Sequence, residues 1–544
     1  MSDNAAYDYI VVGAGSAGAV VASRLSENGS YRVLLLEAGT KGSSHFWARV
    51  PVGTSKMIDD PTVNWCYKSE PDEGSGGRRI DVPRGKMMGG SSSINGMVYM
   101  RGQAQDYDHW AQLGNRGWSY QDVLPIFQRM ERYEGGSDKF RGRNGLLRVN
   151  DTPRNKVPLL EKIIEAAERI GLPFNPDQNG ESQEGIGMSQ VTIAGGKRQS
   201  TAVCYLDPVR GRQNLVIVQG AMAEAIILEG RRCVGVRYSV GGTSVEARAS
   251  REVIVSGGSI NSPKLLELSG IGQPELLGSV GITPVHELRG VGENLRDHYS
   301  PRLKFAIAAR NMTFNDNARG WRLAREAMKY ALFGTGFLAS TAVPVRMYFR
   351  TREGLETPDS TISILPFLYE MVGRQRRVAK RQGITMNANV LRSESTGSIH
   401  IKSADPEVPP AIRFNFLSTE HDRAGIVAVI RKGRELMATS PLREITGEEI
   451  APGAKLQSDE ELLEWVRNNA ETTYHPVGTC KMGSDAMAVV DRELRVHGIE
   501  GLRVADASIM PTLTSGNTNA PAIMIGEKCA EMVLATAATL RKAA

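Results

Sequence analysis

Residues 7–38 read YDYIVVGAGSAGAVVASRLSENGSYRVLLLEA, and this stretch decides the fold. Residues 7–12 form an apolar run of strand length, and residues 13–18 match the pattern G-x-G-x-x-G. The periodicity of residues 16–27 predicts a helix, and the apolar run 31–36 predicts a second strand. Strand, glycine-rich turn, helix and strand in this order predict a βαβ unit that binds the phosphates of a dinucleotide.

Each glycine of this turn has its own expected role. Gly13 lets the chain turn sharply, Gly15 lets the backbone approach a pyrophosphate, and Gly18 lets helix and strand pack closely. The helix N-terminus presents free N–H groups and a positive dipole end to the phosphates. Glu37, about twenty residues beyond the last glycine, is placed to accept from ribose hydroxyls. The alternative is an ordinary tight turn between a strand and a helix.

The composition is that of a globular protein, with 41% hydrophobic and 23% charged residues among 544. The net charge of +6 includes one basic run, RQRRVAKR at 374–381. No aromatic residues interleave this run, so we expect a solvated loop or helix face and no nucleic-acid partner. Five cysteines lack C-x-x-C spacing, which indicates a reduced, intracellular protein without a disulfide framework or a metal site.

The N-terminal residues MSDNAAYDY lack the basic and apolar regions of a secretory signal. No apolar run approaches the length of a membrane span. We therefore expect a soluble cytoplasmic protein.

A second glycine-rich segment, PRGKMMGGSSSINGMVYMRG, occupies residues 83–102. Neither an amphipathic helix nor an alternating strand explains it, whereas a backbone that follows a flat polar ligand closely does. Together with the opening βαβ unit, the segment resembles the first signature of the GMC (glucose–methanol–choline) oxidoreductases. Residues 257–272 (GGSINSPKLLELSGIG) resemble the second signature of that family, and residues 291–298 (VGENLRDH) resemble a further block.

The resemblance implies FAD as the cofactor. Some members of the family carry a histidine in the 83–102 segment that bonds covalently to the flavin. Ile94 occupies that place here, so we expect FAD to bind without a covalent bond. The resemblance and the opening motif assign cofactor contacts to Gly13, Gly15, Ser16, Ala17, Glu37, Ala38, Gly90, Ser91, Asn95, Gly96, Met97, Val98, Ala223, Asp506, Ala507, Thr518 and Asn519.

The predicted fold is α/β, with a Rossmann-like FAD-binding domain and a second, α+β domain that binds the substrate. The FAD-binding domain is expected to comprise residues 1–155, 205–300 and 470–544. The discontinuous substrate-binding domain is expected to comprise residues 156–204 and 301–469, where strands and helices alternate as in a mixed sheet backed by helices.

Local patterns predict the remaining elements. Strands are expected at 215–219, 220–228, 234–240 and 243–248, then a separate buried strand at 252–256, and others at 343–349, 361–367, 398–401, 412–416 and 502–505. Helices are expected at 159–170, 321–332, 423–438, 459–469 and 521–535.

The C-terminal part of the chain carries the residues suited to chemistry. His475 lies in the loop TTYHPVGTCKMG at 472–483, a motif that matches the catalytic histidine of the family. Aligned on the last predicted helix, the family's second catalytic position falls on Asn517. His475 is suited to take a hydroxyl proton, and the Asn517 amide can orient the substrate without carrying a proton. The alternative is that Asn517 only caps the helix, with its role taken by Asn519.

The substrate pocket is the least patterned region. Tyr474, Phe367 and Tyr369 are candidates to line it, and core packing is at least as good an explanation for the last two. The chain looks closest to bacterial choline dehydrogenase-like proteins, a group that spans aliphatic, aryl, furanic and sugar-like alcohols. Choline is one candidate only, because an aromatic cage with a carboxylate cannot be assembled from the sequence.

The resemblance implies oxidation of an alcohol to an aldehyde or ketone, by proton abstraction and hydride transfer to flavin N5. The electron acceptor, O2 or another, stays open, because oxidases and dehydrogenases share these motifs. Three alternatives are a hydroxynitrile lyase on the same scaffold, a nicotinamide-dependent dehydrogenase, and a flavin-binding protein without catalysis. The second of these leaves residues 83–102 and 501–533 unexplained.

Overall fold

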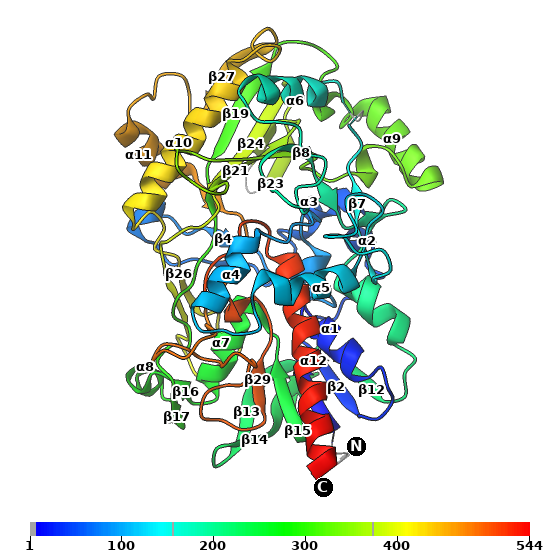
Figure 1. Cartoon of the computed structure of the whole chain (residues 1–544), viewed down its shortest axis with the longest axis vertical. Helices are drawn as coiled ribbons and strands as arrows, with labels where there is room; N and C mark the ends of the chain where they lie inside the picture. The colour runs from blue at the N-terminus through cyan, green and yellow to red at the C-terminus, as the bar shows by residue number, and fades with distance from the viewer. Residues whose placement is uncertain (1–6, 155–156, 373–374, 544) are drawn as a thin grey trace.

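The computed structural model describes residues 7–154, 157–372 and 375–543, and its two large sheets lie at opposite ends of the molecule (Figure 1). Each sheet is built into its own hydrophobic core. The predicted α/β class, with a Rossmann-like unit and a second sheet, is confirmed.

The first sheet combines parallel and antiparallel pairs. Strands β12, β2, β1, β15 and β29 pair in parallel, whereas β15, β14 and β13 pair antiparallel. Strand β2 is buried along its whole length, as its apolar run predicts. The strand order is β12 (Leu215–Gln219), β2 (Val33–Glu37), β1 (Tyr7–Val12), β15 (Thr243–Val255), β14 (Arg232–Val240) and β13 (Met222–Glu229), with β29 (Leu502–Val504) also paired with β15.

Strand β15 corrects one prediction. The strands expected at 243–248 and 252–256 are a single element of 13 residues. Its first half pairs antiparallel with β14, and its second half pairs in parallel with β1 and β29. Residues 249–251 contain neither glycine nor proline, so nothing in the sequence breaks the strand there.

Two helices pack together beside this sheet, α1 (Gly18–Leu25) and α12 (Asn519–Ala543) (Figure 1). Helix α1 is shorter than the predicted 16–27, because the chain is still in the glycine turn up to Ala17. Helix α12 is longer than the predicted 521–535 at both ends, and its first turn faces the middle of the molecule.

The second sheet has six strands within the described residues. All of its pairs are antiparallel, in contrast to the mixed sheet expected for this region. The reason is that no strand–helix–strand crossover joins neighbouring strands of this sheet, and a parallel pair requires one. Its order is β27 (Thr446–Ala451), β19 (Arg302–Ile307), β24 (Gly383–Val390), β21 (Ser360–Leu365), β20 (Val345–Phe349) and β8 (Gly185–Met188).

Helices cover this second sheet. Helix α10 (Glu420–Met437) packs on β21 and β24, and α6 (Leu159–Arg169) packs on α10 and β8. Helix α11 (Asp459–Asn469) packs on α10 and has the predicted bounds. Strands β25 (Ser398–His400) and β26 (Ala411–Arg413) pair only with each other within the described residues.

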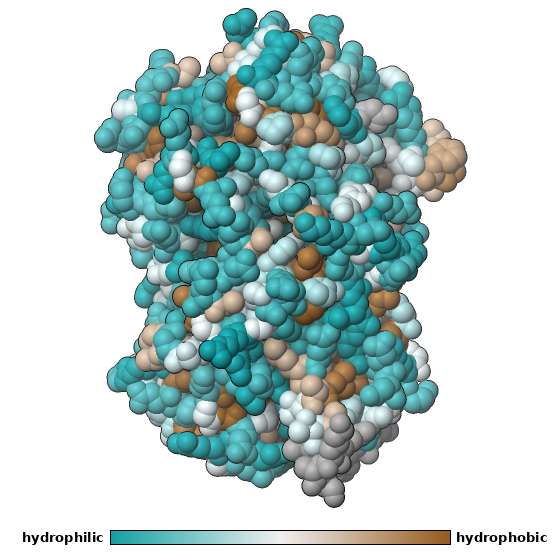
Figure 2. Space-filling view, in the orientation of Figure 1, coloured by the Kyte–Doolittle hydropathy of each residue, from teal (hydrophilic) through white to brown (hydrophobic). Residues whose placement is uncertain are grey.

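Helix α9 (Gly320–Phe333) projects from the molecule, and Figure 2 shows apolar side chains gathered on it at the right edge. Trp321, Met328 and Phe333 are among its exposed side chains.

The basic run at 374–381 is not the expected loop or helix face. Its strand β23 (Gln375–Val378) forms a hairpin with β22 (Tyr369–Val372), while Arg374 lies outside the described residues. Within the described chain, no helix is both long and apolar enough to cross a membrane.

Candidate active site

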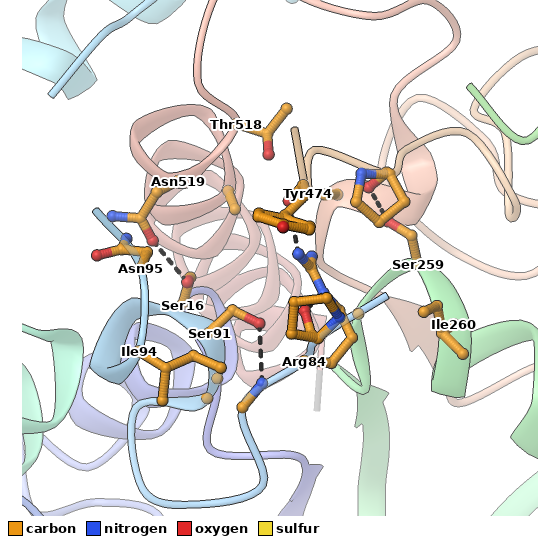
Figure 3. A pocket seen from close by; sticks show the side chains of 18 of the residues that line it. Ser16, Arg84, Ser91, Ile94, Asn95, Ser259, Ile260, Tyr474, Thr518 and Asn519 are labelled. Carbon is orange, nitrogen blue, oxygen red and sulfur yellow. Dashed lines mark hydrogen bonds between the residues drawn. The ribbon is translucent and has the colours of Figure 1, made fainter. Parts of the chain in front are cut away.

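A cavity lies between the two sheets and is lined by segments far apart in the sequence (Figure 3). The turn after β1, the second glycine-rich segment, the start of α12 and strand β20 all reach it. The structure brings these predicted site residues together around it: Gly13, Gly15, Ser16, Ala17, Glu37, Ala38, Gly90, Ser91, Asn95, Gly96, Met97, Val98, Ala223, Tyr369, Tyr474, His475, Asp506, Ala507, Asn517, Thr518 and Asn519.

Phe367 is not among the residues that line the cavity; it packs against the core of the second sheet. Strand β21 ends at Leu365, two residues earlier than the predicted strand, so the alternation of faces does not carry Phe367 to the cavity. Tyr369 does line the cavity, and the Lys304 ammonium lies 4.3 Å from the centre of its ring.

The glycines of the first turn are needed for different structural reasons. Gly13 has φ +101°, and a Cβ on it would lie 2.5 Å from Ser256 O, while a Cβ on Gly18 would lie 1.9 Å from Gly13 O. A Cβ on Gly15 would meet only Ser256 O, at 3.9 Å. Neither backbone strain nor protein packing therefore requires glycine at position 15. Gly15 lines the cavity, and a glycine there fits the close approach of a dinucleotide's phosphates to the backbone.

Glu37 is the buried acid at the end of β2. Its carboxylate accepts from the N–H of Ala14 at 3.0 Å and of Gly39 at 2.8 Å, which joins the end of β2 to the glycine turn. Burial raises the pKa of Glu37 to about 7, and the two N–H donors and Lys86 oppose this shift. The acid thus supports the turn directly, besides lying where a ribose is expected.

The second glycine-rich segment is held open toward the cavity. Buried Arg198 donates from Nη1 to the backbone oxygen of Asn95 at 2.7 Å and to its side-chain oxygen at 2.8 Å. A Cβ on Gly96 would meet no protein atom within 4 Å, and Met97 is left-handed with φ 63°. Ile94 lines the cavity beside them (Figure 3). This backbone cradle fits the flat, polar ring system of FAD.

The start of α12 is tied to the first glycine turn. Ser16 Oγ donates to Asn519 Oδ1 at 2.8 Å, across 503 residues of chain (Figure 3). Asp506, which follows β29, bonds to the start of α7 (Gly258–Leu268). Its carboxylate accepts from the N–H of Gly258 and of Ser508, both at 2.8 Å, and from the Ser262 hydroxyl. The helix N-terminus therefore faces the cavity with its positive dipole end.

A chain of hydrogen bonds runs through the two predicted catalytic residues. Arg346 Nη1 donates to Asn517 Oδ1 at 2.6 Å. Since a guanidinium only donates, the atom of Asn517 that it contacts is the oxygen, and the amide nitrogen faces His475. Asn517 Nδ2 then donates to His475 Nε2 at 2.8 Å. His475 Nε2 therefore carries a lone pair, and in the neutral ring the proton is on Nδ1.

A second histidine completes this arrangement. His298 Nε2 donates to Leu391 O at 2.8 Å, so the other nitrogen of the neutral ring is an acceptor. That nitrogen, Nδ1, lies 3.0 Å from His475 Nδ1, which can donate to it and to Thr473 Oγ1 at 2.9 Å. Both ends of this hydrogen-bond chain thus favour the same tautomer of His475, with the proton on Nδ1.

The surroundings keep both histidines neutral. Burial lowers the pKa of His475 well below 6.5, and the neighbouring His298 ring and the positive charges of Arg346 and Arg84 lower it further. Burial lowers the pKa of His298 to about 4, against the hydrogen bond to Leu391 O. A neutral imidazole whose Nε2 is unprotonated can act as a base without first losing a proton, once a substrate hydroxyl takes the place of the Asn517 N–H.

Asp297 holds the two histidines in place. Its Oδ1 accepts from the backbone N–H of His298 at 2.7 Å and of His475 at 2.9 Å, and its Oδ2 accepts from the Thr472 hydroxyl. Burial raises the pKa of Asp297 to about 6, although the Thr472 hydroxyl, Arg84 and the two N–H groups oppose the shift. This carboxylate joins the loop before β18 (Tyr299–Ser300) to the loop after β28 (Glu471–Thr472).

Tyr474 has a left-handed backbone, with φ 70°, directly before His475. Its N–H donates to Thr472 Oγ1 at 2.8 Å, and Arg84 Nη2 donates to its carbonyl at 2.6 Å (Figure 3). Such a backbone costs about 1–3 kcal/mol and persists only when its surroundings hold it. The left-handed backbone of Tyr474 sets the direction in which the next side chain, His475, points.

The sequence did not single out Asp297, His298, Arg84 or Arg346. The family block that ends at His298 was the one available signal for the first two. Arg346 carries no motif, and it reaches Asn517 only because the second sheet covers the cavity.

The geometry defines the class: a dinucleotide turn, a second backbone cradle and a neutral histidine facing the space between them. The chain matches the GMC oxidoreductase family over residues 7–300 and again over residues 393–526. It is 43% identical over 529 residues to an oxygen-dependent choline dehydrogenase of Brucella suis biovar 1 (strain 1330), covering 97% of this chain and 95% of that one. It is 42% identical over 532 residues to one of Escherichia coli O127:H6, with coverages of 97% and 95%.

Solved structures agree over almost the whole chain. Pyridoxine 4-oxidase from Mesorbium loti superposes with a TM-score of 0.85 at 28% identity, covering 96% of this chain and 98% of that one. Formate oxidase from Aspergillus oryzae RIB40 superposes with a TM-score of 0.91 at 25% identity, covering 98% and 99%. The chain belongs to the GMC oxidoreductases, and it is an FAD-dependent alcohol oxidoreductase.

Proposed function

We propose that His475 is the base that takes the substrate's hydroxyl proton and that Asn517 orients the substrate. The observation that carries this proposal is the hydrogen-bond chain from Arg346 through Asn517 to His475, which keeps Nε2 unprotonated and able to accept from a substrate hydroxyl in place of the Asn517 N–H. FAD, when bound, supplies the two-electron acceptor for the hydrogen on the carbinol carbon. The protein's own part is to bind the alcohol, hold its hydroxyl against Nε2 and receive the proton.

The two asparagines at the start of α12 have different contacts, and this supports Asn517 as the catalytic partner. Asn517 contacts His475, whereas Asn519 accepts from Ser16 in the glycine turn. Asn519 therefore suits the cofactor, together with Thr518. The alternative in which Asn517 serves only as a helix cap leaves its bonds to His475 and Arg346 without a purpose.

The cofactor is proposed to be FAD bound without a covalent bond. The apolar Ile94 side chain, which lines the cavity, offers no nucleophile at the place where some relatives carry a histidine. Denaturing the purified protein and filtering it tests this directly. Yellow filtrate supports the proposal, and flavin that stays with the polypeptide contradicts it.

We also propose residues 1–155, 205–300 and 470–544 as the FAD-binding domain, with residues 156–204 and 301–469 forming the substrate-binding domain. Strand β8 supports the assignment of the early excursion, since it completes the second sheet. The two residues at the first boundary, 155–156, lie outside the described residues.

For the electron acceptor we propose O2, on the support of relatives that are called oxygen-dependent.

The test of the base is His475→Ala, compared with His109→Ala as a control on the exposed face of α4 (Ala104–Gln112). Alcohols are added without oxygen, and the loss of flavin colour is followed. We expect bleaching at least 100-fold slower in His475→Ala, with FAD still bound, and an unchanged rate in the control. Wild-type rates in His475→Ala would remove the base assignment, and product formation with flavin that stays oxidised would indicate a lyase.

A further inference from the structure

We infer that the substrate is an alcohol that also carries a carboxylate, and that Arg346 binds this carboxylate. The inference rests on the proposed function, because it concerns the same cavity and assumes that His475 faces the hydroxyl group. It departs from the cationic substrate that appears in the names of the curated relatives.

Arg346 is a buried charge without a counter-ion. Its side chain is 4% exposed and lines the cavity from strand β20. Within the described residues it forms no ion pair, and its Nε is buried without a hydrogen-bond partner. The Arg346 guanidinium lies 5.1 Å from the centre of the Tyr348 ring, which carries no negative charge. A buried guanidinium without a carboxylate is costly, so the arrangement points to an anion that arrives with the ligand.

The hydrogen bond to Asn517 decides which edge of Arg346 is left for a ligand. Nη1 is engaged at 2.6 Å, and no hydrogen bond within the described residues uses Nε or Nη2. Two N–H groups along one side of a guanidinium match the two oxygens of a carboxylate. Since one amide separates Arg346 from His475, the carboxylate lies within a few bonds of the carbinol carbon.

The acids at the cavity offer nothing to a cationic substrate. Among the described residues, Glu37 and Asp506 are the two carboxylates that line it, and both are engaged. Glu37 accepts from the N–H groups of Ala14 and Gly39. Asp506 accepts from the N–H groups of Gly258 and Ser508 and from the Ser262 hydroxyl.

Of the aromatic rings of Trp65, Tyr369 and Tyr474 that line the cavity, the first two already hold cations. The Lys86 ammonium lies 4.6 Å from the centre of the Trp65 ring, and the Lys304 ammonium lies 4.3 Å from that of Tyr369. An aromatic cage for a quaternary ammonium needs ring faces that no other cation occupies. The cavity is also lined by Arg84 and Lys264, whose positive charges favour an anion over choline.

The experiment compares acids with their amides on the holoenzyme. Glycolate, 3-hydroxypropionate and 4-(hydroxymethyl)benzoate, each paired with its carboxamide, and choline are added without oxygen, and the rate of flavin reduction is followed. We expect at least one acid to exceed its amide by 100-fold or more in rate over dissociation constant, with choline slower still. Amides or choline that equal the acids would overturn the inference and leave the proposed function intact.

Variants separate binding from positioning. Arg346→Met is expected to lose at least 100-fold on the acid and under 10-fold on the amide, with partial recovery of the acid in Arg346→Lys. Arg350→Met, which removes the exposed ion pair with Glu184 just beyond β20, is the matched control and is expected to behave as wild type. An equal loss on acid and amide would contradict carboxylate binding, because it would mean that Arg346 acts only by positioning Asn517 or through the cofactor.

A binding readout keeps the test independent of turnover. Benzoate and acetate carry no carbinol, and their binding is measured by the change in the flavin absorption spectrum and in Tm. We expect both changes in wild type and at least a 10-fold weaker dissociation constant in Arg346→Met. If the proposed base is wrong and no alcohol is oxidised, carboxylate binding that depends on Arg346 still supports the anion site, and its absence rejects it.

Discussion

Among single residues of the site, Arg346 fixes the orientation of the Asn517 side chain. Arg346 can only donate, so it turns the oxygen of Asn517 toward itself and the nitrogen toward His475. The tautomer of His475 is thus set by a residue that need not touch the hydroxyl group itself. His298 and Asp297 act on the same ring from the other side, through Nδ1 and through the backbone.

Replacement of Asn517 tests this directly. We predict that Asn517→Ala loses about 1–4 kcal/mol of transition-state stabilisation, because both the orienting amide and the partner of Arg346 are removed. Asn517→Asp places a carboxylate against Arg346 and removes the donor to His475 Nε2, so we expect the pKa of His475 to rise. The rate of flavin reduction and its pH dependence measure both effects.

Asn519→Ala is the matched control for Asn517. It removes the bond to Ser16 and leaves the histidine chain whole. We expect weaker FAD retention with a near-normal reduction rate once FAD is saturating. A reduction defect larger than that of Asn517→Ala would exchange the roles of the two asparagines.

At the scale of the element, the crossing of α1 and α12 holds the cofactor side of the cavity. Arg24 and Glu527 join the two helices by two hydrogen bonds, at 2.9 and 3.0 Å. Gly526 allows the close approach, because a Cβ there would lie 2.7 Å from Ala17 O. Displacing α12 would move its first turn, which begins at Asn519, two residues after Asn517.

We therefore predict that Gly526→Ala destabilises the protein by about 1–3 kcal/mol and weakens FAD binding. Gly278→Ala in α8 (Pro274–Ser279) is the control, since a Cβ at that exposed site would meet nothing within 4 Å. It is expected to be neutral or stabilising by up to about 1 kcal/mol. Tm and the FAD content of the purified variants are the measurements, and equal behaviour of both would contradict a tight helix crossing.

The elements also show what a sequence can and cannot predict. The turn at 13–18 and helix α11 were predictable because their patterns are local. The continuity of β15 was missed because its two halves have different partners, which only the tertiary structure reveals. Arg346 was missed for the same reason, since its contact with Asn517 spans 171 residues.

At the scale of the whole molecule, two hydrophobic cores meet at a cavity that neither encloses alone. A ligand there contacts residues from both sheets, so it stabilises the folded state of the whole. We predict that removal of FAD lowers Tm, and that FAD at about 1,000 times its dissociation constant restores about 4 kcal/mol. FMN, which lacks the adenosine part, is the control and is expected to restore less, while an unchanged Tm on FAD removal would contradict the shared cavity.

The neutral state of His475 is tested most directly by the pH dependence of anaerobic flavin reduction at low substrate concentration, in wild type and in Arg346→Met. His475 must be neutral to accept a proton, and burial and nearby positive charge lower its pKa well below 6.5. We predict a rate that is flat above pH 6.5 and falls only below it, with the fall moved to higher pH in Arg346→Met, where one positive charge is gone. If the wild-type rate begins to fall while the pH is lowered but still above 7, or if both proteins give the same pH profile, a neutral His475 held by Arg346 and Asn517 is contradicted.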